Sequence, residues 1–191
     1  MRTYHVIYAG PGMSGRQESL RVLCSPGSPR VPEDPRYPWE HLADGADIPL
    51  ASRVARVRIA LMYFGNHWFP TVSAVLGSPY GRFVERLIEF LPVLDGVVFV
   101  ADSQPERTEA GLAALELLLE FMRERGLDPA QVPFVFQLNK RDLPNVLHVE
   151  ELRTILSTPR CAHVESIAVR QRGVHQALET LLRLVDSATP P

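Results

Sequence analysis

Short apolar runs alternate with segments of helical periodicity along most of the chain. Residues 3–9 (TYHVIYA), 96–101 (GVVFVA) and 133–138 (PFVFQL) are almost continuously apolar and rich in β-branched or aromatic residues. Runs of this kind are typical of buried strands in parallel sheets. Further strands are predicted at 53–63, 68–76 and 162–168.

Between these strands, apolar residues recur every three to four positions, which predicts amphipathic helices. We expect Ser103 to cap a helix that ends near Arg125, with Gly126 as its stop. The apolar face of this helix is expected to consist of Leu112, Leu115, Leu119 and Met122. Other helices are predicted at 16–24, 80–91, 147–157 and 173–187.

Alternating strands and helices predict an α/β fold of three layers, a mainly parallel six-stranded sheet covered by about five helices. One antiparallel edge hairpin is expected from 53–63 and 68–76, turning at Gly65 and Asn66. In such folds ligands bind at the carboxyl ends of the strands. The loops that follow the strands are therefore the places to look for chemistry.

One segment, at about 25–50, breaks the pattern. Six prolines and two glycines in this stretch exclude a long helix or a central strand. Connections of this length inside a domain are usually functional or without fixed structure. We expect one domain over 1–191, with this irregular proline-rich loop and a short disordered tail at about 187–191.

Composition narrows the function classes. A formal net charge of −2 gives no electrostatic case for nucleic acid or an anionic membrane. No apolar run approaches the ~20 residues of a bilayer span, so no integral membrane segment is expected. Two cysteines are too few for a disulfide framework, which favours a cytoplasmic protein. Lys140 is the one lysine among 20 basic residues.

The loop after the first predicted strand has the spacing of a phosphate-binding loop. The pattern G-x-x-x-x-G-K-[ST] matches at Gly10 and Gly15, between a strand and a helix. Such loops surround phosphate oxygens with backbone N–H groups and a helix N-terminus. The candidate nucleotide-binding residues are Gly10, Gly12, Met13, Ser14, Gly15, Arg16 and Gln17. The alternative is a glycine turn in which Glu18 supplies the negative charge favoured by the helix dipole.

Two positions of this loop depart from the pattern. Arg16 stands where lysine reaches the terminal phosphates, and arginine is not a conservative exchange for lysine. Gln17 replaces the Ser or Thr whose hydroxyl holds Mg²⁺ and is a poor magnesium ligand. Magnesium binding is therefore expected to be weak or absent, and no metal ligand is assigned.

A second motif, Asn139-Lys140-Arg141-Asp142, follows the apolar run at 133–138. It has the form N-K-x-D, the guanine-specificity signature. The Asp142 carboxylate can accept hydrogen bonds from guanine N1–H and the exocyclic amine, which adenine cannot supply. Asn139 is expected to tether the neighbouring loops, and the Lys140 stem to lie over the base.

Together these segments resemble the Ras-like small GTPases, specifically the bacterial gliding-motility (MglA-type) branch. The matching stretches are VIYAGPGMSG, LDGVVFVADSQPER, VPFVFQLNKRDLP and VESIAVRQRGV. Ala168, at the end of the last predicted strand, stands where small GTPases present a backbone amide to guanine O6. The resemblance implies the P-loop NTPase (Ras-like) fold and a cytoplasmic switch that binds GDP and GTP and acts in cell polarity or motility. It also implies a Roadblock/LC7-type (MglB-type) partner protein or a related GTPase.

The chain departs from that family where magnesium, the γ-phosphate and the attacking water are handled. No threonine occurs between Thr3 and Thr71, and no glutamine between Gln17 and Gln104. The family's Pro-Gly-Gln looks replaced by residues 76–78 (LGS), and residues 48–94 contain no aspartate. We assign no catalytic residue and expect GTP hydrolysis to be weak or absent.

Two functions remain open at this point. The first is an MglA-like switch that binds guanine nucleotide and hydrolyses GTP slowly or not at all. The alternative is a nucleotide-free pseudo-GTPase that serves as a protein-interaction module. In either case the predicted helix 80–91, with Trp68 and Phe69, is the candidate partner surface.

Overall fold

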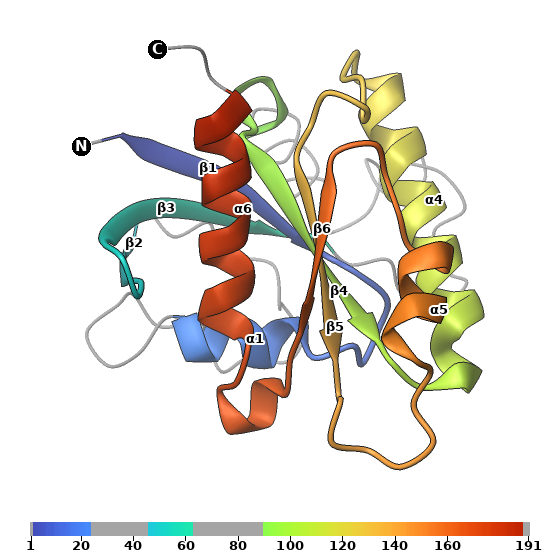
Figure 1. The fold of residues 1–191 in the computed structure, drawn as a ribbon. Helices are drawn as coiled ribbons and strands as arrows, with labels where there is room; N and C mark the ends of the chain where they lie inside the picture. The colour runs from blue at the N-terminus through green and yellow to red at the C-terminus, as the bar shows by residue number, and fades with distance from the viewer. Residues whose placement is uncertain (1, 24–45, 63–89, 189–191) are drawn as a thin grey trace, which may run out of the picture.

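The computed structural model describes residues 2–23, 46–62 and 90–188 (Figure 1). Six strands form one sheet in the order β2-β3-β1-β4-β5-β6. Only the β2–β3 pair is antiparallel, and the other four pairs are parallel. The strands are β1 (Thr3–Ala9), β2 (Ala46–Pro49), β3 (Val54–Leu61), β4 (Gly96–Asp102), β5 (Phe134–Asn139) and β6 (Cys161–Glu165). The predicted mainly parallel six-stranded sheet with an antiparallel edge is confirmed.

Helices cover both faces of the sheet, as predicted. Figure 1 shows α1 (Arg16–Leu23) and α6 (Val174–Ala188) on one face, and α4 (Thr108–Glu124) and α5 (Val149–Ile155) on the other. These are the four α-helices among the described residues. Three short 3₁₀ helices complete the elements: η1 (Leu91–Val93), η2 (Pro105–Arg107) and η3 (Ala168–Arg170).

The hydrophobic core has two halves, one on each side of the sheet. Along β1, Val6 and Tyr8 pack into the half that contains α1 and α6, whereas Ile7 and Ala9 pack into the half with α4 and α5. Every residue of β4 and β5 is buried. Burial on both faces explains why these strands are continuously apolar in sequence rather than alternating.

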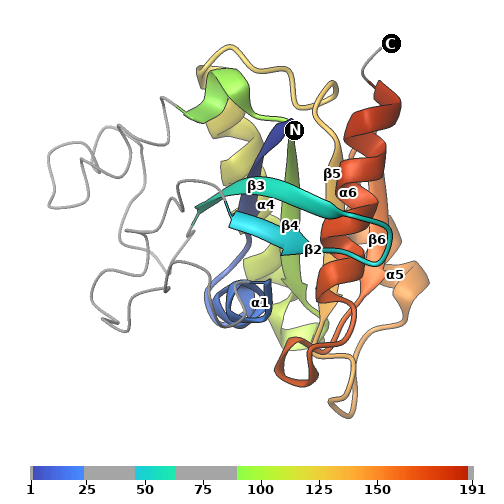
Figure 2. The ribbon, with the colours of Figure 1, turned by 90° about the vertical axis from the view of Figure 1, so that its left-hand side faces the viewer.

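The antiparallel edge is formed by a different segment from the one predicted. β3 pairs with β2, at 46–49, within the stretch predicted to be irregular (Figure 2). The two strands turn where Leu50 N donates to Arg53 O at 2.8 Å. Pro49 is tolerated because it ends a strand at the sheet edge. Strand 68–76, the Gly65-Asn66 turn and residues 80–89 of the predicted helix 80–91 lie outside the described residues, whereas Phe90 and Leu91 are buried.

The helix predicted from Ser103 begins later, and two of its four predicted core residues, Leu115 and Met122, are buried. Ser103 does not cap it: α4 follows η2, and Arg107 is at its N-cap position without a side-chain cap. The core face carries Gly111, Ala114, Leu115, Leu118, Phe121 and Met122. Leu112 and Leu119 are only partly buried. The short helix η2, with Pro105 in its first turn, lies between Ser103 and α4. Gly126, at φ +78°, ends the helix as predicted.

Candidate functional site

The loops singled out in the sequence meet at one edge of the sheet. Strands β1, β4, β5 and β6 run parallel, so their carboxyl ends lie together, at the bottom of Figure 1. The 10–15 loop follows β1, the 140–147 loop follows β5, and the loop with η3 follows β6. This edge is the binding position of open α/β sheets.

The 10–15 loop has the backbone of a concave turn. Gly10, Met13 and Gly15 adopt φ values of +142°, +62° and +98°, and Ser14 N donates to Pro11 O at 3.4 Å. A Cβ on Gly10 would lie 2.3 Å from Val100 O, so a side chain there would collide with β4. Successive N–H groups in such a conformation make an anion-binding nest. The Ser14 hydroxyl is buried in this turn without a hydrogen-bond partner among the described residues.

At the start of α1, the two residues that depart from the phosphate-loop pattern, Arg16 and Gln17, differ in burial. The Arg16 side chain is buried, and its Nη1 donates to the Met62 carbonyl just after β3. Gln17 is exposed, and Glu18 pairs with Arg21 at 3.1 Å. The described part of the chain contains no group of three or more His, Cys, Asp or Glu side chains that could hold a metal ion.

Asn139 joins the three loops. Its Nδ2 donates to Ser14 O at 2.8 Å, and its Oδ1 accepts from Ser166 Oγ at 3.0 Å and from Ala168 N at 2.9 Å. The residue is 3% exposed. A Cβ on Gly15 would lie 2.1 Å from this Nδ2, so glycine is needed for the approach. The tether predicted for Asn139 is confirmed.

A second polar link, which the sequence pattern does not predict, is made by Gln137, two residues before Asn139 on β5. The fully buried Gln137 donates from Nε2 to Ser19 Oγ at 2.8 Å, and Ser19 Oγ donates to Gly15 O at 3.0 Å. Gln137 lies in the apolar run 133–138, whose pattern predicts a strand and no polar link. A polar residue in a strand buried on both faces was the signal, because such side chains need a partner.

Lys140 forms an ion pair with a residue that the sequence analysis left without a role. Its Nζ is 2.6 Å from Oδ2 of Asp102, whose side chain is fully buried at the end of β4. Lys140 has a left-handed backbone, at φ +64°. Asp102 could have been identified, because it is an acid directly after a buried strand at the ligand-binding edge. That the Lys140 stem covers a base stays a prediction.

The Asp142 carboxylate is left without a hydrogen bond among the described residues. Its side chain is 20% exposed, and the nearest cation, Arg170 Nη2, is 3.8 Å away. Arg141 instead fixes the loop, because its backbone N donates to Ser166 O at 3.2 Å and its Nε to Glu165 at 3.0 Å. The ion pair with Arg170 is thus the one polar contact of the Asp142 carboxylate among the described residues.

The η3 loop is held close to the end of β6. Ile167 and Arg172 form an isolated antiparallel bridge. Gly173, at φ +78°, is pressed against this turn, since a Cβ there would lie 2.1 Å from Glu165 O. Ala168 N donates to Asn139 Oδ1 at 2.9 Å, so the amide predicted to contact guanine O6 is bound within the protein in this structure. Ala168 belongs to η3 rather than to the strand predicted at 162–168, because β6 ends at Glu165.

The assembled edge fits a guanine nucleotide chemically. The nest of the 10–15 loop and the N-terminus of α1 suit phosphate groups. The open carboxylate of Asp142 suits a partner with two adjacent N–H donors, as guanine has. Asn139 fixes the distance between the loops that carry the two features.

Comparison with known proteins agrees with this geometry. The chain matches no family model. It is 45% identical over 187 residues to the mutual gliding-motility protein MglA of Myxococcus xanthus (strain DK1622), and the match covers 94% of this chain and 89% of the relative. None of the described helices is both long and apolar enough to cross a membrane. On this identity, and with the Ras-like sheet and loops, the chain belongs to the MglA-type family of Ras-like small GTPases.

Proposed function

We propose that this protein is a guanine-nucleotide-binding switch whose GTP hydrolysis is weak or absent. The observation that carries the proposal is the set of hydrogen bonds made by the buried Asn139, which joins Ser14 O to Ala168 N. These bonds hold the candidate phosphate and base loops in fixed relation. Buried side chains that tie loops to each other at a ligand-binding edge position a site in advance.

Base choice is assigned to Asp142. Its carboxylate accepts from guanine N1–H and the exocyclic amine, whereas adenine presents no such pair of donors. A site built to form hydrogen bonds rejects a ligand that lacks the matching groups by large factors, because its own polar atoms are then left unpaired. GDP and GTP are therefore the proposed ligands, and ATP is excluded.

The residues at the positions that would contact magnesium and the phosphates support weak hydrolysis. Gln17 offers an amide where a hydroxyl would bind Mg²⁺, and residues 4–70 contain no threonine to sense magnesium and the γ-phosphate. Arg16 is engaged with the Met62 carbonyl. Each missing electrostatic contact to the transition state costs several kcal/mol, on the order of 10² to 10³ in rate.

For the cellular role we propose polarity or motility signalling, because the relative is named for gliding motility. The proposed partner is a Roadblock/LC7-type (MglB-type) protein or a related GTPase. The candidate contact surface is helix 80–91 with Trp68 and Phe69. Its residues 68–69 and 80–89 lie outside the described residues, whereas Phe90 and Leu91 are buried in the core. We place the protein in the cytoplasm, where a free thiol such as that of Cys161 stays reduced.

Calorimetry tests the proposal. The purified chain is titrated with GDP, GTP and ATP, each with and without Mg²⁺. We expect both guanine nucleotides to bind, ATP not to bind, and magnesium to change the affinities little. The proposal fails if neither guanine nucleotide binds more tightly than about millimolar, which corresponds to about −4 kcal/mol.

The second candidate function is the nucleotide-free pseudo-GTPase, and the burial of Arg16 favours it. A phosphate would have to compete with the Met62 carbonyl for this guanidinium. Only a ligand that binds the native state raises the melting temperature. A rise with a Roadblock-type partner but not with GDP would support this candidate, and stoichiometric GDP in the purified protein would exclude it.

A further inference from the structure

A chain of charged contacts crosses the site at the end of β4. This strand lies between β1 and β5, so Asp102 sits between the strands that carry the phosphate loop and the N-K-x-D loop. Its Oδ2 is 2.6 Å from Lys140 Nζ and 3.9 Å from Arg107 Nε. Its Oδ1 accepts from Gln104 N at 3.2 Å. The Asp102 carboxylate is thus fully buried and shared by two cations.

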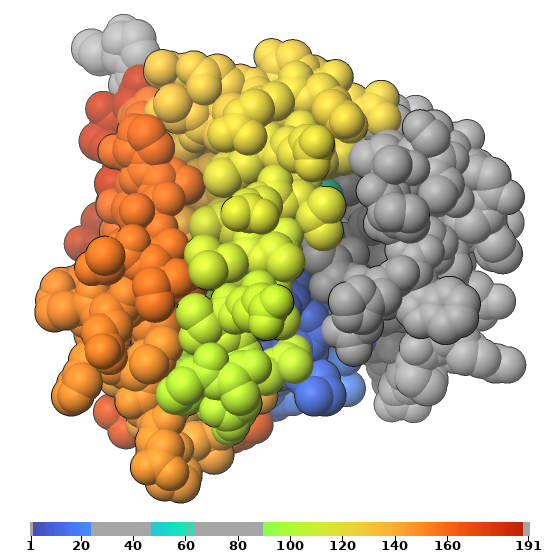
Figure 3. Space-filling model, turned by 90° about the vertical axis from the view of Figure 1, so that its right-hand side faces the viewer, coloured from blue at the N-terminus to red at the C-terminus, as the bar shows by residue number. Residues whose placement is uncertain are grey.

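Arg107 carries this contact on to the phosphate loop. It is the last residue of η2, and its Nη2 donates to the Gly12 carbonyl at 2.7 Å. The arginine side chain is 23% exposed, so the bond is largely shielded from solvent. Figure 3 shows the green segment at the beginning of α4 against the blue N-terminal segment. Residues 95 positions apart in sequence are therefore in direct contact.

The bond acts on the peptide between Gly12 and Met13. The peptide unit is planar and trans, so its carbonyl and its N–H point in opposite directions. While Arg107 holds the Gly12 carbonyl, the Met13 N–H is turned away from Arg107. Met13 has a left-handed backbone at φ +62°, which a non-glycine residue adopts only at a cost. The hydrogen bond offsets that cost.

We propose that Arg107 is a positioning residue that sets the affinity for the nucleotide's phosphates by fixing the Gly12–Met13 peptide. Asp102 holds the guanidinium in place and, through Lys140, connects it to the N-K-x-D loop. The inference rests on the proposed function, since it assigns a part of the same guanine nucleotide site. Arg107 acts through the loop backbone and needs no contact with the nucleotide.

The first test compares Arg107→Ala, Arg107→Lys and the control Arg123→Ala by calorimetry with GDP and IDP. Arg123 is an exposed arginine in the last turn of α4. Arg107→Ala removes a charge-assisted hydrogen bond, so we expect GDP to bind about 10- to 100-fold more weakly. IDP lacks the exocyclic amine read by Asp142, and the GDP-to-IDP ratio of Kd values should stay as in wild type. Arg107→Lys should recover part of the loss, because one ammonium can reach the carbonyl or the carboxylate but not both.

The second readout is the ³¹P spectrum of bound GDP. The β-phosphate resonance should move in Arg107→Ala and stay in place in Arg123→Ala, because only the first changes the N–H groups around the phosphate. Replacing Arg107 in the Asp102→Asn background should weaken GDP less than it does in wild type, since the two residues act along one contact chain.

The outcomes separate the inference from the proposed function. If wild type does not bind GDP, both fail. If wild type binds GDP and Arg107→Ala binds it equally well, or with the β-phosphate resonance unmoved, the inference is overturned and the proposed function stands. A changed GDP-to-IDP ratio in Arg107→Ala would also overturn it, because the residue would then act on the base.

Discussion

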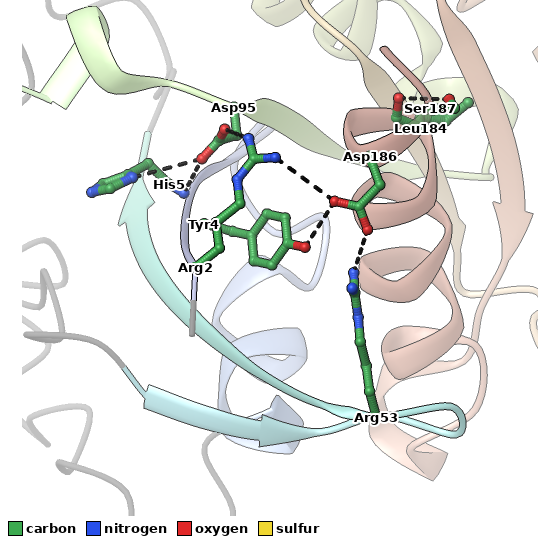
Figure 4. Close-up of polar contacts among 8 residues, drawn as sticks. All are labelled: Arg2, Tyr4, His5, Arg53, Asp95, Leu184, Asp186 and Ser187. Atoms are coloured by element: carbon green, nitrogen blue, oxygen red, sulfur yellow. Dashed lines mark hydrogen bonds and ion pairs between the residues drawn. The ribbon is translucent and has the colours of Figure 1, made fainter. Parts of the chain in front are cut away.

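Polar side chains are held differently at the carboxyl ends of the strands, the carboxyl edge, and at their amino ends, the amino edge. At the carboxyl edge, neutral side chains such as Asn139 and Gln137 are buried and bind the backbones or hydroxyls of loops. At the amino edge, partly exposed charged side chains bind one another (Figure 4). The amino-edge cluster consists of Arg2, Tyr4, His5, Arg53, Asp95 and Asp186.

In the amino-edge cluster each carboxylate oxygen accepts a hydrogen bond. Asp186 accepts from Tyr4 Oη and from Arg53 Nη2, both at 2.8 Å. Asp95 accepts from His5 N at 2.8 Å and from Arg2 Nη2 at 2.6 Å. The two arginines also lie over the Tyr4 ring, at 5.0 and 5.2 Å from its centroid. This cluster ties β1 and the β2–β3 turn to α6.

The carboxyl edge, in contrast, contains polar atoms that have no hydrogen-bond partner in the part of the chain that the structure describes. The Ser14 and Ser103 hydroxyls are buried without hydrogen-bond partners among the described residues, and the Asp142 carboxylate has no hydrogen bond there either. Unsatisfied polar groups are rare in native proteins and need a reason. The carboxylates of the amino-edge cluster all have donors, whereas the carboxyl edge has polar atoms that a ligand could bind.

The largest expected effect comes from filling the space at Gly15. In Gly15→Ala the new methyl would meet Asn139 Nδ2 at a backbone angle of φ +98°. We expect a loss of about 3–5 kcal/mol in the free energy of unfolding, measured by urea denaturation, and loss of GDP binding. Gly111→Ala in α4 is the control, because nothing lies within 4 Å of its added Cβ. Alanine there should raise stability by up to about 1 kcal/mol. Equal effects at both positions would contradict the account.

Asn139→Ala removes the tether without adding atoms. It leaves Ser14 O and Ala168 N unpaired in a buried place, so we expect a loss of about 2–3 kcal/mol in unfolding free energy. Hydrogen exchange should speed up in the 10–15 and 166–173 loops and stay unchanged at the amino edge. The exposed Gln131, replaced by alanine, is the control. Unchanged exchange in both loops would show that Asn139 is not the tether.

The smallest effect is expected at the amino edge. Asp186→Asn should cost about 0.5–1 kcal/mol of unfolding free energy at neutral pH, because the ion pair with Arg53 is partly exposed. GDP affinity should not change. A weakened GDP affinity in this variant would mean that the two edges are coupled, and the contrast drawn between them would be wrong.

The same cluster predicts a pH dependence. Burial opposes ionisation of Asp186, but hydrogen bonds from Tyr4 and Arg53 outweigh it and lower its pKa below 3.8. Its contribution to stability is therefore present above that value and is lost as the pH falls through the lowered pKa. Burial, together with the bond to Asp186, raises the pKa of Tyr4 above 10.0. That contribution is present below pH 10 and is lost as the pH rises through the raised pKa. In Asp186→Asn, the unfolding free energy measured by urea denaturation should therefore change less with pH than in wild type, at both the acidic and the basic end.

The sequence predicted the carboxyl edge better than the amino edge, for physical reasons. Buried parallel strands such as 96–101 have a continuous apolar signature, and glycine-rich or N-K-x-D loops have fixed local spacing. The cluster around Asp186 joins segments far apart in sequence and has no local pattern. The contacts of Asp102 and Arg107 were missed for the same reason, although the stretch that contains both had been noted.

The antiparallel edge shows how local signals mislead. Gly65-Asn66 favoured a hairpin there, whereas β3 pairs with the segment before it. Proline density made 46–49 look irregular. A single proline at the end of an edge strand does not prevent pairing. Proline lacks a backbone N–H, and at the outer side of an edge strand no neighbouring strand needs that donor.

The measurement that tests the guanine site most directly is a change of base preference in Asp142→Asn. The asparagine amide donates where the carboxylate accepted, which suits the C2 oxygen of xanthine in place of guanine's amine. By calorimetry, wild type should prefer GDP to XDP and the variant should prefer XDP, with GDP weakened about 100-fold or more. Glu116→Gln, on the exposed face of α4, should behave as wild type. If GDP and XDP bind wild type and the Asp142→Asn variant alike, Asp142 does not recognise the base and the site is not a guanine site.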